Sequence, residues 1–221
     1  MPADPRPTLL LTRPQPGAER FAKLMKGWRS VISPVLRIAP VDHDGDILAA
    51  AQGLVFTSAH AVASAGPGRG RPALCVGAQT ARQARDAGFD VTEGGGTADS
   101  LLPLIKGASV PLIHPHGRHL ARMLPVPGVV VYDQQAVDLS EEARGLLMGK
   151  APVILPIFSP RTALVLAQHA ADARAPLWVV AISDAALGNW SGPARHAITA
   201  ERPDAHGMRD AILRLWASEQ S

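Results

Sequence analysis

The chain of 221 residues is poor in several residue types that mark common classes of protein. Its single cysteine, Cys75, cannot form a disulfide within the chain, and its place in an apolar run indicates a small core residue. Only 4% of the residues are aromatic and the basic residues are scattered, so the sequence offers little on which bases could stack. No apolar run approaches the roughly 18 residues of a membrane span. We therefore expect no disulfide, no nucleic-acid partner and no membrane partner.

Motifs that would supply strong chemistry are missing as well. His114, His116 and His119 could suggest a metal site, because residues i and i+2 share one face of a strand. However, Pro115 is expected to end the strand, and no cysteine or carboxylate cluster completes a ligand set. The sequence also has no nucleophile elbow. We therefore predict no metal, and expect any enzyme built from this chain to act mainly by holding its substrate in shape.

The sequence does contain an internal repeat. The apolar run that ends at Phe56 returns 102 positions later at Phe158, and both are followed by hydroxylated residues. Two more pairs of segments follow in the same order, at spacings of 106 and 107 positions, and a fainter pair precedes them. These pairs are Leu74–Ala81 with Val180–Leu187, Val91–Glu93 with Ile198–Ala200, and Leu10–Thr12 with Leu112–His114. Four units in one order indicate an internal duplication and predict two similar lobes.

Each repeated unit is a short apolar run, then a turn, then an amphipathic stretch. The runs, such as Trp178–Ile182, show no alternation, which is typical of parallel strands covered on both faces. Strand, turn and helix in repetition predict an α/β fold with parallel sheets and right-handed crossovers. In such sheets ligands bind beyond the carboxyl ends of the strands. Polar or glycine residues fall at these ends: Thr12, Arg13, Thr57, Ser58, Gly77, Thr80, Ser159 and Ser183.

Two extended segments stand between the repeated units. Ser33–Pro40 and Pro127–Asp133 contain β-branched residues and are bounded by proline or glycine. Each follows the first unit of its half of the chain. We interpret them as strands that cross between the two lobes, which would face each other across a cleft.

The charge balance and the first residues bear on ligand and location. The net charge is +3, the isoelectric point is about 9.5, and arginine outnumbers lysine 18 to 4. Arginine pairs well with carboxylates and phosphates, although a GC-rich genome produces the same bias. The stretch Met1–Pro5 lacks a basic-then-apolar signal pattern, which predicts a cytoplasmic protein.

Seven short motifs, in this order and spacing, resemble the uroporphyrinogen-III synthase family. The resemblance runs from about Leu9 to Leu215, and each motif is weak on its own. The motifs are Leu-Thr-Arg-Pro ending at Pro14, Phe-Thr-Ser-Ala-x-Ala-Val from Phe56, Val-Gly-x-x-Thr-Ala from Val76 with Ala-x-x-Ala-Gly-Phe ending at Phe89, Val-Tyr ending at Tyr132, Phe-Ser-Pro-x-x-Ala from Phe158, Ala-Ile-Ser ending at Ser183, and Ala-Glu-x-Pro from Ala200.

The resemblance implies a particular fold. The family has two flavodoxin-like or Rossmann-like α/β lobes with parallel sheets, joined by a two-stranded crossing. Carried over to this chain, the first lobe is discontinuous, because the first strand and helix return to sit with the C-terminal part. It would contain residues 1–35 and 138–221, and the second lobe residues 39–131. The crossing strands would be residues 36–38 and 132–137.

The resemblance also implies a reaction. Linear hydroxymethylbilane loses water to give an azafulvene, ring D is inverted through a spiro intermediate, and the macrocycle closes as uroporphyrinogen III. No cofactor is used, and the expected partner of a monomeric enzyme is this small-molecule substrate. Because the substrate closes unaided to a symmetrical isomer, the enzyme must chiefly impose geometry. The substrate's many carboxylates suit the N–H and hydroxyl donors of strand-end turns and helix N-termini.

Family motifs assign candidate roles to single residues. Tyr132 matches the tyrosine proposed to assist departure of the hydroxyl group, so it is the candidate catalytic residue. The alternative is that its ring only packs on apolar surface. For the candidate hydroxyl ligands, the alternative role is to cap the following helix. The candidates for substrate binding are Arg13, Thr57, Ser58, Gly77, Thr80, Gly117, Arg118, Ser159 and Ser183.

Some positions depart from the family's pattern. His60 stands where a relative can carry arginine, and Ala185–Ala186 replace a threonine pair, which leaves Ser183 and backbone amides as the donors of that turn. Arg118 lies near the family's Arg-Gly region in altered order. Arg13 matches better, with pairing to a carboxylate of its own lobe as the alternative. These departures keep a second hypothesis open, in which the chain is a non-catalytic two-lobed module that binds an anionic small molecule.

Overall fold

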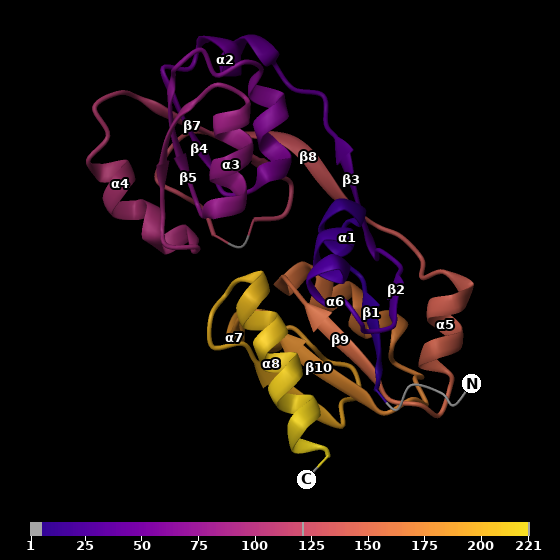
Figure 1. Ribbon diagram of the computed structural model, residues 1–221. Coiled ribbons are helices and arrows are strands. Elements are labelled where there is room, and N and C mark those ends of the chain that lie inside the picture. Colours follow the sequence, from indigo (N-terminus) through magenta and orange to yellow (C-terminus); the bar gives the residue numbers. More distant parts are fainter. Residues whose placement is uncertain (1–5, 121, 221) are drawn as a thin grey trace. The chain divides into compact units, whose positions relative to one another are not determined.

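The computed structural model describes residues 6–120 and 122–220, and the chain divides into two compact units. Unit 1 takes the chain up to Arg37 and again from Gln135 onward, whereas unit 2 is Ile38–Gln134. Each unit has its own sheet and its own hydrophobic cores, and each is described separately below (Figure 1).

Unit 1 is a parallel sheet with helices on both faces. In the described residues the strand order is β11-β10-β9-β1-β2, with β1 (Thr8–Leu11), β2 (Ser30–Ile32), β9 (Val153–Ile157), β10 (Leu177–Ala181) and β11 (His196–Thr199). Every residue of β9 and β10 is buried, as the unbroken apolar runs predict. Two cores lie on opposite faces of this sheet, because neighbouring strand residues such as Leu9 and Leu10 belong to different clusters.

The helices of unit 1 divide between these two cores. One core packs the sheet against α1 (Gln15–Leu24) and α8 (Ala205–Ser218), which both lie in front of the sheet in Figure 1. The other packs it against α5 (Glu141–Leu147), α6 (Pro160–His169) and α7 (Asp184–Leu187). In the described part of the chain, no helix is both long and apolar enough for a membrane span.

Unit 2 repeats this plan with one more strand. Across residues 6–120 and 122–220, its sheet has the order β3-β8-β7-β4-β5-β6, with β3 (Leu36–Pro40), β4 (Gly53–Phe56), β5 (Pro72–Cys75), β6 (Asp90–Glu93), β7 (Leu112–Gly117) and β8 (Gly128–Ala136). The helices are α2 (Gly45–Ala50), α3 (Ala78–Asp86), α4 (Leu102–Lys106) and the 3-10 segments η1 (Ala59–Ala65) and η2 (Ala98–Leu101). The α/β fold with parallel sheets that the sequence predicts is confirmed.

The two sheets have matching strand orders. If β7 is set against β1, as the faint first repeat suggests, then β6-β5-β4-β7-β8 in unit 2 corresponds to β11-β10-β9-β1-β2 in unit 1. β1 opens the first half of the repeat but lies in the sheet of unit 1, beside the strands β9, β10 and β11 of the second half. Likewise, β7 opens the second half but lies in the sheet of unit 2, with the strands β4, β5 and β6 of the first half. The duplication is thus visible in the topology as well as in the sequence.

The chain passes between the units in β3 and β8. The Val41 N–H donates to the Val131 carbonyl at 3.0 Å, and the Val137 N–H donates to the Val35 carbonyl at 3.0 Å. Residue numbers therefore rise along one segment as they fall along the other. The boundaries between the units fall within these two strands.

One local expectation is wrong, because β7 does not end at Pro115 but continues through it to Gly117. The His114 N–H donates to the Pro127 carbonyl beside β8, and N–H groups alternate in direction along a strand. The nitrogen of Pro115 therefore faces the β4 side, where the described pairing is Gly53 with Leu112 and Leu54 with Ile113. The missing N–H of Pro115 therefore coincides with the end of the pairing with β4 and does not interrupt the pairing with β8. His114 and His116 consequently lie on one face of one strand.

Candidate functional site

In unit 2, five of the predicted residues come together at the carboxyl ends of β4 and β7. Thr57 and Ser58 follow β4 directly, and β4 is the parallel neighbour of β7. Gly117 ends β7 and is in register with Tyr132 on β8, past an irregularity between His116 and Gly117. The fifth, Arg118, donates its backbone N–H to the Tyr132 carbonyl at 2.9 Å.

Tyr132 is almost fully buried, with 6% of its surface exposed, and its ring belongs to the core beneath the sheet. The ring packs directly against Gly117, where an added Cβ would stand 2.6 Å from two ring carbons. Burial raises the pKa of the Tyr132 phenol, and the Ser58 side chain and the Gly117 backbone, which hydrogen-bond to it, oppose that rise. The ring therefore packs, as the alternative reading held, and it also holds a protonated hydroxyl between two polar partners.

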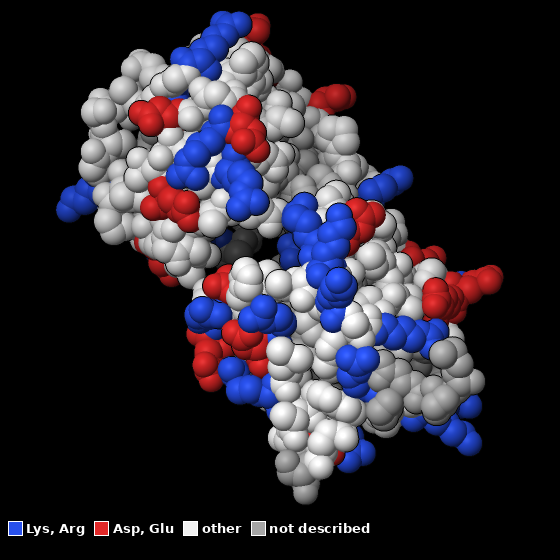
Figure 2. Space-filling model, viewed as in Figure 1, with Lys and Arg blue, Asp and Glu red and all other residues white. Residues whose placement is uncertain are grey.

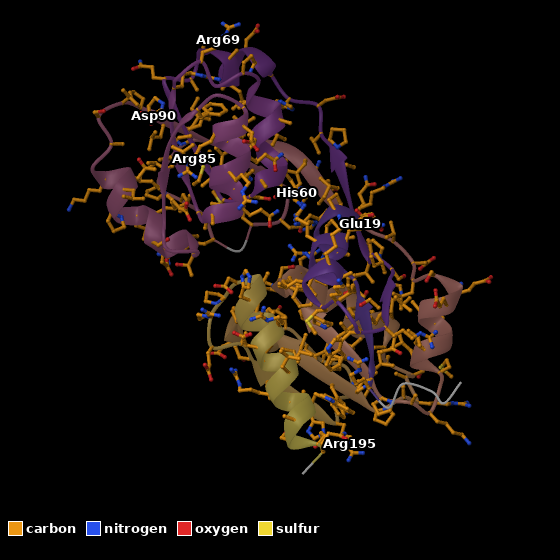
Figure 3. All side chains as sticks on the ribbon, viewed as in Figure 1. Glu19, His60, Arg69, Arg85, Asp90 and Arg195 are labelled. Carbon is orange, nitrogen blue, oxygen red and sulfur yellow. The ribbon has the colours of Figure 1, made fainter. Side chains whose placement is uncertain are left out.

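His60 completes the surroundings of the tyrosine on the η1 side. Its ring meets the Tyr132 ring edge to face, with centroids 5.8 Å apart, and it is labelled in Figure 3. The Ser58 hydroxyl accepts a hydrogen bond from the His60 backbone N–H at 3.3 Å and so caps η1. Ser58 thus has the capping role expected as the alternative while also reaching the phenol.

Behind these residues lies a pair of buried histidines. His114 and His116 are 2% and 8% exposed, with ring centroids 4.9 Å apart. His114 Nε2 and Thr57 Oγ1 are 2.9 Å apart, and His116 Nδ1 is 2.8 Å from the Gly117 carbonyl oxygen, so each ring supports a predicted site residue. Burial, and secondly the proximity of His116, lower the pKa of His114 to about 4, so this ring is neutral at pH 7.

The sequence had raised these histidines only as possible metal ligands. Within residues 6–120 and 122–220, no group of three or more His, Cys, Asp or Glu side chains is arranged to hold a metal ion. His119 Nε2 instead lies 3.5 Å from Asp133 Oδ1, and Arg118 Nε lies 3.6 Å from Asp133 Oδ2. The sequence signal for the supporting role of His114 and His116 is their i, i+2 spacing, which places both side chains on one face of β7. The expected end of the strand at Pro115 obscures this signal.

The remaining predicted residues of unit 2 lie at the start of α3. Gly77 is the N-cap and has extended backbone, with φ of −173°, and its added Cβ would meet Gly96 Cα at 3.5 Å. Having no side chain to cap the helix, Gly77 leaves the first N–H groups of α3 open to a ligand. Thr80 is 5% exposed on the face of α3 that packs on the core, so its hydroxyl lies below the surface.

In unit 1, Ser159 and Ser183 occupy equivalent places after β9 and β10. The Ser159 hydroxyl accepts from the Thr162 N–H at 3.1 Å and lies 2.9 Å from the Thr162 hydroxyl, and Ser183 accepts from the Ala186 N–H at 3.3 Å. Both serines cap their helices, α6 and α7, as the alternative reading held. The replaced threonine pair, Ala185–Ala186, forms the first turn of α7, and Ala186 is fully buried.

Arg13 is the cationic residue of the unit 1 strand ends. Its guanidinium carbon lies 4.1 Å from the centroid of the Phe158 ring. Burial, followed by the nearby charge of Arg20, lowers the pKa of Arg13 to about 10, which still leaves it protonated at pH 7. No carboxylate of the described residues lies within ion-pair distance of this guanidinium, so the expected alternative, pairing within its own lobe, is not observed there. Figure 2 shows further basic side chains over α1.

Both units are α/β domains with parallel strands, the class of fold in which ligands bind beyond the carboxyl ends of the strands. Comparison with known proteins identifies the family. A model of the family described as uroporphyrinogen-III synthase HemD matches residues 19–210, and the chain belongs to that family. Its members are cyclising hydro-lyases of tetrapyrrole biosynthesis, and the activity of this chain is that of a uroporphyrinogen-III synthase.

Solved structures agree with this assignment at the level of the fold. Uroporphyrinogen-III synthetase from Helicobacter pylori is 14% identical, with a TM-score of 0.66 over 95% of this chain and 99% of that chain. A mutant uroporphyrinogen III synthase from the extremely thermophilic bacterium Thermus thermophilus is 16% identical, with a TM-score of 0.54 over 96% of this chain and 100% of that chain. Curated protein sequences gave no significant match.

Proposed function

We propose that Tyr132 is the proton donor in the conversion of hydroxymethylbilane to uroporphyrinogen III by this chain. The observation that carries the proposal is the buried, protonated phenol held between Ser58 and Gly117 at the ends of β4 and β7. A buried donor is kept from exchanging its proton with bulk water, and its two polar partners favour the phenolate that forms.

The proposed first step balances as follows. The carbon–oxygen bond of the substrate's hydroxymethyl group breaks as electrons from the pyrrole nitrogen form an exocyclic carbon–carbon double bond. The leaving oxygen takes the Tyr132 proton and departs as water. The pyrrole N–H then returns a proton to the phenolate, which leaves a neutral azafulvene and restores the tyrosine. Ring D inversion and closure need no bond to the protein, so they depend on how the substrate is held.

We propose that donors of both units bind the substrate's carboxylates. In unit 2 these are Thr57, the open N-terminus of α3 at Gly77, and Arg118 with the adjoining Gly117, while Thr80 lies beneath them. In unit 1 they are Arg13, whose half-buried guanidinium has no carboxylate partner among the described residues, and the helix N-termini at Ser159 and Ser183. The binding residues then outnumber the one residue that transfers a proton, as suits a reaction governed by geometry.

We further propose that both lobes take part in substrate binding. The two lobes, residues 1–35 with 138–221 and residues 39–131, would bind the substrate together in a cleft, joined by crossing strands at residues 36–38 and 132–137. We propose that the protein is a monomer. We expect it to act in the cytoplasm on its diffusible substrate.

A coupled assay tests the proposal. Hydroxymethylbilane is generated in the cuvette, the products are oxidised, and the type I and type III isomers are separated by chromatography. We expect the purified protein to yield type III product above an enzyme-free control. Only type I product, together with tight binding of the porphyrin, would favour the non-catalytic binding module instead.

A further inference from the structure

We infer that Gly17 and Phe158 are positioning residues that fix the Arg13 guanidinium where a substrate carboxylate can meet it. The inference rests on the proposed function, in which Arg13 binds substrate. It assigns a specific task to two residues that have none so far, and it concerns unit 1 alone.

The Phe158 ring packs against the Arg13 guanidinium. β1 and β9 are parallel neighbours, so Arg13 and Phe158, which follow them, lie side by side. The Arg13 guanidinium carbon stands 4.1 Å from the ring centroid, within the range of a cation–π contact. The Phe158 ring is itself held by Phe21 of α1, edge to face with centroids 5.0 Å apart, and Phe21 is 1% exposed. The Phe158 ring is therefore fixed by a contact with a core residue.

Gly17 lies beside the same Arg13 side chain, and its lack of a side chain leaves room for the guanidinium. An added Cβ there would stand 2.5 Å from Arg13 Nε and 2.9 Å from its guanidinium carbon, so the flexible end of the Arg13 side chain would have to move away. Gly17 lies inside α1, where alanine would favour the helix more than glycine does. Its φ is not in the left-handed region, so the backbone does not require glycine. Glycine instead leaves the space that the Arg13 guanidinium occupies, so alanine at this position would displace that charge.

Among the described residues, no carboxylate pairs with the charge held in this way. The nearest acid along α1, Glu19, accepts a hydrogen bond from Gln15 at 2.7 Å instead. Arg20 places a second positive charge near Arg13, and burial removes water from the guanidinium. A desolvated cation beside another cation is unfavourable unless an anion arrives. A substrate carboxylate is the ligand that would satisfy it, through the planar fork of N–H donors.

A double-mutant cycle tests the inference. We expect Arg13→Ala to raise KM about tenfold or more, because it removes charged hydrogen bonds to the substrate. Gly17→Ala, which keeps the charge and displaces it, should raise KM about tenfold. In the Arg13→Ala background, Gly17→Ala should have no further effect on KM. An equal loss from Gly17→Ala in both backgrounds would show that Gly17 acts through the helix and would overturn the inference.

A matched control separates displacement from helix effects. Gly145 lies in α5 of the same unit, and its added Cβ would meet nothing within 4 Å. Gly145→Ala therefore makes the same chemical change in a helix without touching a site residue, and we expect an unchanged KM. If Gly17→Ala leaves KM at the value of this control, Arg13 does not need the space and the inference fails.

Phe158 is tested by loss and rescue. Phe158→Leu should raise KM about threefold, because the cation–π contact is lost while an apolar side chain remains. Phe158→Tyr keeps the ring face and should restore the KM of the unchanged protein. Equal effects of leucine and tyrosine would show that Phe158 serves packing only.

A binding measurement keeps this test independent of turnover. Uroporphyrin, a stable macrocycle with many carboxylates, is titrated against each variant by fluorescence. The dissociation constants should follow the same cycle, with coupling between positions 13 and 17. Coupled binding without type III product would retain the positioning role and reject the catalytic proposal. Type III product, with no coupling between positions 13 and 17 in either the dissociation constants or the KM values, would retain the catalytic proposal and reject the positioning role.

Discussion

The strand ends of the two units are built alike but charged differently. In unit 2, the phenol of Tyr132 and the ring of His114 are buried and neutral at pH 7, because burial raises the pKa of one and lowers that of the other. In unit 1, Arg13 is half-buried and remains charged. One copy of the duplicated scaffold is thus suited to donating a proton, and the other to binding an anion.

Equivalent positions show how the two copies diverged. Phe56 and Phe158 match in the repeat, yet Phe56 is fully buried in β4 and packs on Phe89, whereas Phe158 lies beyond β9 under Arg13. Gly77 and Ser183 also match, and both begin a helix. The glycine leaves its helix N-terminus uncapped while the serine caps its own. A single repeated plan therefore supplies different donors at corresponding places.

The sharpest way to break this comparison is Tyr132→Phe. The ring would pack as before, so we expect a normal fold and a loss of about 100-fold or more in kcat, which is typical for removal of a general acid. KM should change little, in contrast to Arg13→Ala. Initial rates of type III formation and a thermal melt measure the two effects. Undiminished kcat would reduce the tyrosine to a packing residue.

Gly117→Ala examines the fit around the tyrosine without removing its hydroxyl. The new Cβ would overlap the Tyr132 ring, which must shift away from its partners. We expect a cost of about 1–3 kcal/mol in the free energy of unfolding, as for overpacking in a core, and a fall of about tenfold in kcat. Denaturant unfolding and initial rates give both numbers. An unaffected rate in a folded variant would mean that the contact between Gly117 and Tyr132 has no part in the reaction.

Buried His114 makes the stability of unit 2 sensitive to acid. The pKa of His114 falls from about 6.5 when unfolded to about 4 when folded, so between these values the unfolded chain binds more protons. Folding is then favoured less as the pH falls from 6.5 towards 4, with about 2 kcal/mol lost between pH 7 and 5. Denaturant unfolding at both pH values should show this loss, and His114→Gln, which retains a partner for Thr57, should show much less. Equal acid sensitivity in that variant would assign the effect to other groups.

Most of the architecture follows from the sequence, and most of the electrostatics does not. Unbroken apolar runs and their repetition indicate parallel strands, and ligand-binding strand ends follow from that topology. The exception is local: Pro115 does not end β7, because its nitrogen faces β4 and the pairing with β8 continues past it. The lowered pKa values of His114 and Arg13 arise chiefly from burial. Burial depends on residues that are distant in the sequence, so no short motif predicts these pKa values.

The smallest effect is expected at Ser159, where capping and substrate binding must be separated. Its hydroxyl caps α6, and a cap contributes about 1 kcal/mol, so Ser159→Ala should lower stability by that amount. It should also slow turnover while leaving type III product detectable, because donors at several strand ends share the carboxylates, as for Thr80→Ala. Ser140 caps α5 in the same unit, accepting from the Ala143 N–H at 3.2 Å, and is not among the proposed binding residues. Ser140→Ala should therefore lose similar stability at unchanged KM, so any rise in KM specific to Ser159→Ala measures binding. A complete loss of type III product in folded Ser159→Ala would instead place the reaction's main demand in unit 1, and the division of labour between the two units would be wrong.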